Sequence, residues 1–393
     1  MPPLSTLKNI ILVPLPAGSN QKNLRYELAP SFGTPFDHMR WRRGEITSSS
    51  VYYPLENTLP SHKVVGVSLY GGVLFGAFGH FIAESLHRLW PVFQEPSLAN
   101  VPIVFHSTDP AIATGSALPE WMQQIFALIG ISLDRLVIVN SPIEVEELLV
   151  AQQGSIIGRG PLSSDYSEIF PPVRARSNIT RPRRGHVYIS RSKYIHKGSY
   201  LGEMLVEQVL EETKQFRIVH PQEHPVSEVV DILESSESAV FAEGSAMHLL
   251  ELCREPVPKG FVVLRRREFT WEQFYKGMMD LKVENLSVHP MRASLTSLGW
   301  SRRRESALGQ NASTVQDIPN LLKAISQFCG VKLRTPSDME VRQGYALSLA
   351  SMMLDPQSTR GTFVGTGPAA LLKQLQMQVL ALDILPFDIP IPN

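Results

Sequence analysis

The chain is 393 residues long and carries 37 basic and 37 acidic residues, so its formal net charge is zero. This balance excludes a global electrostatic field that would recruit nucleic acid, and we expect no nucleic-acid partner. Two cysteines, Cys253 and Cys329, exclude a disulfide framework and a zinc site built from cysteines, and they fit a reducing compartment. A chain of this length is expected to form two domains.

The first part of the chain predicts a layered α/β domain. Residues 1–60 are expected to be irregular, because Pro, Gly and Ser are scattered through them. Their apolar run at 10–13 is too short to cross a bilayer, its flanks do not resemble a signal peptide, and no later run is long enough either. The pattern beyond predicts strands at 64–70, 101–106, 136–140 and 148–151, and helices from 79 and at 119–129. Such alternation is typical of a parallel sheet.

A connector rich in proline and arginine follows at residues 170–184. We place the domain boundary here, so that the N-terminal domain comprises residues 1–172. Two interpretations of the arginines stay open. They belong to a solvated linker, which we prefer, or some of them reach an anionic ligand in the cleft between the domains.

The second part restarts the same alternation. It predicts strands at 186–190, 216–219, 239–242 and 261–264, and helices at 200–212, 225–235 and 246–253. The signal weakens beyond Arg267, where only 317–328 and 369–382 read as helices. We expect an α/β fold with two Rossmann-like domains facing a cleft: the second domain spans 173–330, and a helical segment at 331–393 is expected to pack back across the first.

The helix expected from Gly79 carries an unusual polar stripe. His80 and Glu84 are four residues apart and share one face, and Arg88 lies one turn further along the same face. Three interpretations stay open. The pair is structural; or His80, Glu84 and His87 bind a metal, although their spacing is not a recognised zinc motif; or the pair acts as a general base toward an acceptor hydroxyl. We favour the last.

Two further motifs lie at the ends of strands in the second domain, where open α/β sheets bind ligands. Arg191 and Lys193 follow the strand at 186–190, and Arg191 is able to grip a diphosphate in a bidentate manner. A solvated positive loop is an equally weighted alternative. Glu243-Gly244-Ser245 forms a turn that opens a helix, and a helix start favours an anion. An ordinary turn capped by Ser245 is the simpler interpretation.

Glu243 next to an anion would be repulsive unless it contacts a sugar or ribose hydroxyl, which favours a hydroxyl-rich ligand.

The sequence lacks the motifs of several other enzyme classes. No P-loop, no G-x-S-x-G elbow and no Asp-x-Asp metal motif occurs, and no G-x-G-x-x-G follows a strand. A dehydrogenase is therefore disfavoured.

Three blocks of the sequence resemble glycosyltransferase family 61, which includes bacterial capsular-polysaccharide, plant xylan-decorating and animal O-GlcNAc-type transferases. The block GHFIAESLHRLW at 79–90 resembles the family's G-H-F-x-x-(D/E)-x-L-x-R-L-W. The blocks YISR at 188–191 and EGSAMH at 243–248 resemble two later family blocks in order and spacing. The resemblance covers residues 64–265, and its third block departs from the family pattern at Glu243.

The resemblance implies a GT-B-like fold with the donor in the C-terminal domain, and an inverting transfer that needs no metal or other cofactor. It implies Glu84 as the catalytic base, with His80 orienting the acceptor or the base. The substrate-binding residues are then Arg88, Arg191, Lys193, Glu243, Gly244, Ser245, Ala246 and His248, with Arg191 on the donor diphosphate.

We therefore expect a hexosyl- or pentosyltransferase that moves a sugar from a nucleotide-sugar donor to a glycan or glycolipid acceptor. It is expected in the cytoplasm, with peripheral association at the inner face of the membrane as an open alternative. Two other functions stay open: a catalytically silent nucleotide-sugar-binding scaffold of polysaccharide assembly, and a metal-dependent hydrolase that uses His80, Glu84 and His87.

Overall fold

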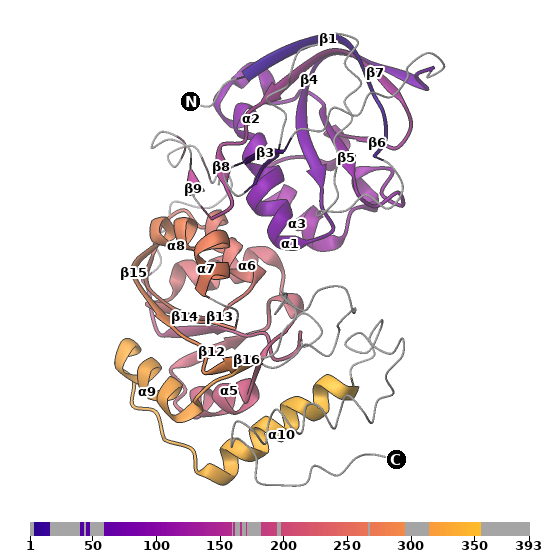
Figure 1. Cartoon of the computed structure of the whole chain (residues 1–393). Coiled ribbons are helices and arrows are strands. Elements are labelled where there is room, and N and C mark those ends of the chain that lie inside the picture. Colours follow the sequence, from indigo (N-terminus) through magenta and orange to yellow (C-terminus); the bar gives the residue numbers. More distant parts are fainter. Residues whose placement is uncertain are drawn as a thin grey trace.

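The protein contains two α/β units, each built on a five-stranded sheet (Figure 1). In the computed structural model the described residues are 4–15, 40–42, 45–47, 59–158, 160–161, 166, 170, 182–194, 198–265, 268–294 and 314–354. The expected domain boundary after residue 172 and the helix expected at 369–382 lie outside them.

The first sheet has the order β1-β7-β4-β5-β6. Its strands are β1 (Leu4–Leu12), β4 (His62–Leu74), β5 (Ile103–Ser107), β6 (Leu136–Val139) and β7 (Ile143–Ala151). The expected parallel pairing is confirmed for the last four, but β1 pairs with β7 antiparallel. The expectation that residues 1–60 are irregular is therefore wrong for β1. This edge strand buries only Ile10 and Leu12 of its nine residues, so it lacks the continuous apolar run that marks a central strand.

The polar-stripe helix of the first unit is not a uniform α-helix. It runs through α1 (Phe78–His80), the π-helical turn η2 (Phe81–Ser85) and the 3₁₀ turn η3 (Leu86–Arg88). In the π turn the N–H of Leu86 donates to the carbonyl of Phe81, five residues back. Such turns insert a residue into the helix and are frequent at functional sites. The other helices of the unit are α2 (Trp90–Gln94) and α3 (Glu120–Leu128), the latter as expected.

The second sheet is parallel throughout and has the order β12-β10-β13-β14-β15. Its strands are β12 (Phe216–Val219), β10 (His186–Ile189), β13 (Ser238–Ala242), β14 (Val257–Val263) and β15 (Val283–His289). Numbered within the unit, the order is 2-1-3-4-5, which is one of the two common doubly wound arrangements. The strand order reverses between β10 and β13, so the crevice at their carboxyl ends is the place where this fold binds ligands.

The helices of the second unit largely follow the expected pattern. They are α5 (Glu203–Glu212), α6 (Val226–Ser235), the 3₁₀ helix η9 (Ser245–Leu252), α7 (Glu268–Phe274) and α8 (Lys276–Lys282). The helix expected at 200–212 starts later, because Tyr200 and Leu201 form strand β11 (Tyr200–Leu201) before Gly202 turns the chain at a φ of 81°. The segment 268–289, which the sequence left unassigned, supplies α7, α8 and β15.

One hydrophobic cluster is shared by the two units. A single buried cluster runs from Phe81 and Phe126 of the first unit to Met247 and Phe241 of the second. Helices α3 and α6 lie side by side, and the N–H of Val226 donates to Gln124 Oε1 at 2.9 Å. The helical segment α1–η2 packs on η9. The helix that carries the polar stripe is thereby placed against the turn that follows β13.

The described C-terminal part belongs to the second unit (Figure 1). Helix α9 (Ile318–Cys329) is confirmed, and α10 (Asp338–Leu354) packs against α5 and β11. The N–H of Gly202 donates to Ser348 Oγ at 3.0 Å. Shorter elements are β2 (Arg40–Arg42), β3 (Glu45–Thr47), β8 (Ser155–Ile156), β9 (Gly160–Pro161), β16 (Ala293–Ser294) and β17 (Thr314–Val315). Within the described ranges, no helix has the length and apolarity that a membrane crossing requires.

Candidate active site

The His80–Glu84 pair forms as the sequence spacing indicates. His80 Nδ1 lies 2.5 Å from Glu84 Oε1. The two side chains differ in accessibility: Glu84 is 2% exposed and His80 is 14% exposed. His80 is therefore the more accessible member of the pair. The pair has the form of an imidazole oriented by a carboxylate.

Arg88 and His87 turn away from this pair. The Arg88 guanidinium is buried and donates through Nη1 to the carbonyl of Ala151 at 2.8 Å. Its Cδ fills the space that a side chain at Gly72 would occupy, 3.1 Å from the position of a Cβ there. Arg88 thus braces the first sheet from inside. The π turn explains this placement, because the extra residue rotates the third turn away from the face of His80.

The metal-binding alternative finds no geometry to support it. His87 bonds to Glu251 and to Tyr166 instead of approaching His80 and Glu84. Within the part of the chain that the structure describes, no group of three or more His, Cys, Asp or Glu side chains is arranged to hold a metal ion.

Arg191 and Gly244 meet at the switch point between β10 and β13. Arg191 follows β10 and is 6% exposed, and Gly244 follows β13. A Cβ at Gly244 would stand 2.2 Å from Arg191 Nη1 and 2.9 Å from Cζ. The guanidinium therefore lies directly on the Gly244 backbone, and it also lies over the Tyr194 ring at 5.7 Å. Two motifs that are 53 positions apart in the sequence form one cationic site.

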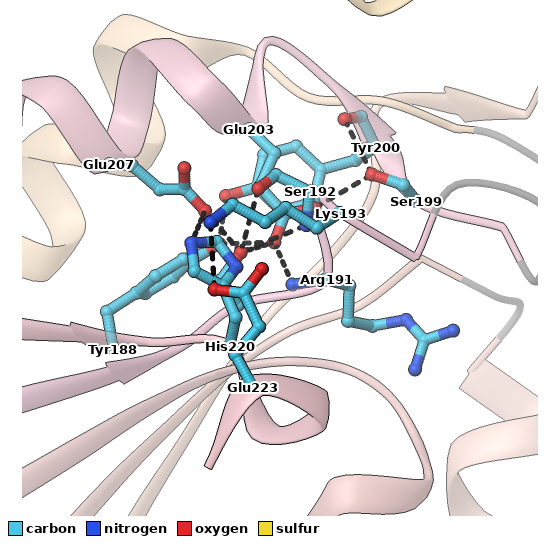
Figure 2. Close-up of polar contacts among 11 residues, drawn as sticks. Tyr188, Arg191, Ser192, Lys193, Ser199, Tyr200, Glu203, Glu207, His220 and Glu223 are labelled. Carbon is cyan, nitrogen blue, oxygen red and sulfur yellow. Dashed lines mark hydrogen bonds and ion pairs between the residues drawn. The ribbon is translucent and has the colours of Figure 1, made fainter. Parts of the chain in front are cut away.

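The backbone of Arg191 is anchored by a buried carboxylate. Glu203, at the start of α5, accepts the Arg191 N–H through Oε1 at 2.7 Å, the Tyr188 hydroxyl at 3.1 Å and the Ser199 hydroxyl at 2.8 Å (Figure 2). Burial raises the pKa of Glu203, against the opposing effect of the Arg191 N–H. Figure 2 shows the guanidinium pointing away from this cluster. Glu203 therefore fixes the loop while the charge of Arg191 projects to the other side.

Lys193 lies on the opposite side of its loop from the guanidinium of Arg191 (Figure 2). Its ammonium pairs with Glu223 Oε2 at 2.9 Å, and both side chains are about half exposed. Nearby, Glu207 accepts the Ser190 hydroxyl, and burial raises the pKa of Glu207. An exposed ion pair such as Lys193–Glu223 contributes little to stability. The structure does not bring Lys193 together with Arg191 at the switch point.

Glu243 is fully buried and faces Arg265. Its Oε2 accepts the Arg265 N–H at 3.0 Å, and its carbonyl accepts Arg265 Nε at 2.8 Å. The Glu243 carboxylate is thus bonded to the backbone of Arg265, and the Arg265 side chain is bonded to the backbone of Glu243. Ser245 does not cap η9, because Gly244 occupies the N-cap position without a side-chain bond. Ala246 is half-buried and packs on the core.

His248 stands where η9 meets the helix of His80. A Cβ at Gly79 would lie 2.8 Å from His248 Cδ2 and 3.3 Å from Nε2. Its Nδ1 lies 2.6 Å from Glu251 Oε1. Sequence reasoning missed Glu203 and Glu251, because an acidic residue in a short helix is ordinary unless its three-dimensional partners are known. The sequence blocks at 79–90 and 243–248 therefore meet through Gly79 and His248.

The comparison with protein families supports a glycosyltransferase. Residues 78–257 match the family model described as Glycosyltransferase 61, and this match supports membership of that family. The matched segment is just under half of the chain and contains every site residue named above except Arg265. The search of curated proteins found no match.

Proposed function

We propose that the protein transfers a sugar from a nucleotide-sugar donor to a hydroxyl group of a glycan or glycolipid acceptor, with inversion and without a catalytic metal. The observation that carries this proposal is the contact of the Arg191 guanidinium with Gly244 at the switch point, close to the His80–Glu84 helix. We place the reaction in the cytoplasm, at the membrane when the acceptor is a lipid. The two buried free cysteines are consistent with a reducing compartment.

The donor side supplies what a leaving diphosphate needs. Arg191 offers a planar guanidinium able to bond two phosphate oxygens at once. Gly244 lets the backbone approach closely, and η9 begins directly after it, at Ser245. Charge stabilisation by Arg191 takes the role that a divalent cation has in transferases built on paired aspartates. A second buried arginine, Arg265, bonds through its Nε to the Glu243 carbonyl behind the turn.

The acceptor side supplies the base. His80 takes the proton of the acceptor hydroxyl, and Glu84, 2.5 Å away, stabilises the imidazolium that forms. The acceptor oxygen then bonds to the anomeric carbon while the bond from that carbon to the phosphate oxygen breaks. The diphosphate leaves with the electron pair and stays with Arg191. One displacement with one base inverts the anomeric carbon. The exposure difference favours His80 as the group that touches the acceptor, with Glu84 behind it.

Binding and turnover test this proposal separately. Titration calorimetry with uridine, guanosine and cytidine diphosphates, each with and without EDTA, measures donor-site affinity. Release of diphosphate from the matching nucleotide sugars, with oligosaccharide acceptors present, measures transfer. We expect chelator-insensitive binding of one diphosphate, weakened in Arg191→Ala and unchanged in the control Arg217→Ala, an exposed arginine paired with Glu228.

Substitutions in the His–Glu pair complete the test. Glu84→Gln and His80→Asn are expected to keep diphosphate affinity and to lower transfer by about 10²- to 10⁴-fold, the usual range for loss of a general base. The exposed Glu228→Gln is the control. Full turnover in Glu84→Gln and His80→Asn would remove the pair from the mechanism. Diphosphate binding without turnover in the native protein would favour the scaffold alternative.

A further inference from the structure

A buried chain of four polar side chains joins the two units. The Tyr166 hydroxyl lies 2.6 Å from His87 Nδ1, His87 Nε2 lies 2.5 Å from Glu251 Oε2, and Glu251 Oε1 lies 2.6 Å from His248 Nδ1. All four residues are at most 5% exposed. His87 comes from η3 of the first unit, whereas Glu251 and His248 come from η9 of the second. One carboxylate is therefore shared by two imidazoles from opposite sides.

The hydrogen-bond acceptors among these four side chains indicate which of their atoms carry protons. Burial opposes ionisation of Glu251, but His87 and His248 outweigh it and hold the pKa of this carboxyl well below its usual range. An ionised carboxylate only accepts, so each imidazole presents an N–H to it. Burial keeps the pKa of Tyr166 well above its usual value, so its hydroxyl retains its proton where it lies within hydrogen-bond distance of His87 Nδ1.

Gly79 preserves the space beside the outer nitrogen of His248. A Cβ at Gly79 would stand 3.3 Å from His248 Nε2 and would overlap Cδ2 at 2.8 Å. Residue 79 immediately precedes His80, the group that reaches the acceptor. The anchored nitrogen, Nδ1, faces Glu251, so Nε2 is directed toward the junction where the helix of His80 meets the donor turn.

We propose that Glu251 is a positioning residue that holds His248 with its Nε2–H directed at the junction between the two units, where this N–H bonds to the phosphate oxygen that leaves the sugar. This inference rests on the proposed transferase function. The N–H stabilises the charge that grows on that oxygen as the bond to the anomeric carbon breaks. His87 and Tyr166 fix the far side of Glu251, so its carboxylate cannot rotate toward another partner. The acceptor helix, through His87, thereby helps to orient a donor-side group.

The charged and titratable groups around His248 come from several elements. They are Glu251 on η9, His87 on η3, Tyr166, Tyr275 with its ring centre 5.2 Å from that of His248, and Lys282 on α8, whose charge also acts on Glu251. Of these, Glu251 alone bonds directly to His248 among the described contacts. Glu251→Gln removes that charge while keeping the shape of the side chain.

The test combines kinetics with nitrogen NMR of the histidine rings. Glu251→Gln is expected to lower kcat by about 10²-fold or more, to change diphosphate affinity less than threefold, and to move the alkaline limb of the pH–rate profile to lower pH. Histidine-labelled protein is expected to show a protonated Nδ1 at His248 in the native chain and a change of protonation state in Glu251→Gln. His248→Gln, which leaves Glu251 and His87 in place, is expected to lose kcat to a similar extent.

The control is Glu234→Gln, a glutamate of the second unit that binds the Arg254 N–H outside the site. Native kcat and pH profile in Glu251→Gln, with Glu84→Gln inactive, would overturn the inference and leave the transferase function standing. An unprotonated Nδ1 at native His248 would overturn it as well, even if no donor turns over. Loss of melting temperature in Glu251→Gln with native kcat in His248→Gln would show a structural role only, which also overturns it.

Discussion

Gly244→Ala is the sharpest test of the proposed donor site. The added Cβ would stand 2.2 Å from Arg191 Nη1, whereas ordinary contact begins near 3.4 Å, so the guanidinium has to move by more than about 1 Å. Gly244 has φ 178° and ψ 179°, extended values that alanine adopts freely, so the change acts through this contact and not through backbone strain. The substitution therefore displaces the charge of Arg191 without removing it.

The magnitude follows from what Arg191 is proposed to bind. A hydrogen bond to a charged group contributes about 1.5–3 kcal/mol, so displacement of the guanidinium is expected to weaken diphosphate binding by roughly 10- to 150-fold. Calorimetry on the native chain, Gly244→Ala, Arg191→Ala and the double variant measures this. The double variant is expected to bind no more weakly than Arg191→Ala, because both changes act on one contact.

The matched control is Gly76→Ala, since Gly76 has nothing within 4 Å of its Cβ position and no positive φ. Native diphosphate affinity in Gly244→Ala, or fully additive losses in the double variant, would refute the placement of the donor phosphates at Arg191.

Three further predictions test other parts of the structure. Gly79→Ala is expected to lower kcat by at least about 10-fold, because its Cβ would press on His248 Cδ2 at 2.8 Å. An unchanged kcat would contradict this prediction, because it would show that the surrounding residues accommodate the added methyl group. Glu203→Gln is expected to weaken diphosphate binding more than the neighbouring Glu207→Gln, because only Glu203 accepts the Arg191 N–H; equal effects in calorimetry would contradict this anchoring. Burial lowers the pKa of His106 to about 4, and its folded value thus lies below the unfolded value near 6.5. The stability it contributes is present above pH 6.5 and is lost as the pH falls toward 4, by at most about 3 kcal/mol. Urea unfolding at pH values from 7 to 4 measures how the free energy of unfolding depends on pH. This dependence is expected to be weaker in His106→Gln.

Strands were predicted best from the sequence where all of their consecutive residues are buried. Strand β13 is buried at all five positions and was predicted at 239–242, because a central strand of a parallel sheet shows as an uninterrupted apolar run. The edge strands β1 and β15 were missed for the opposite reason. Only Val283 of β15 is fully buried, so its sequence carries no such run.

The candidate site was predictable only within single segments. The predicted contact between His80 and Glu84 forms in the structure because the two residues are only four positions apart in the sequence. The π turn, which carries Arg88 off the shared face, leaves no periodic signal in twelve residues of sequence. The contact of His87 with Glu251 joins positions 164 apart, and no spacing rule reaches that far.

The shared core has a consequence for cooperativity. Because one apolar cluster and one buried ionised carboxylate span both units, neither unit retains a closed surface when the other unfolds. A protein whose sequence reads as two domains is then expected to melt in a single calorimetric transition, with agreement between the van't Hoff and calorimetric enthalpies. A chain cut at the connector would expose the faces of Phe81 and Met247 to water, so each half on its own would be prone to aggregation.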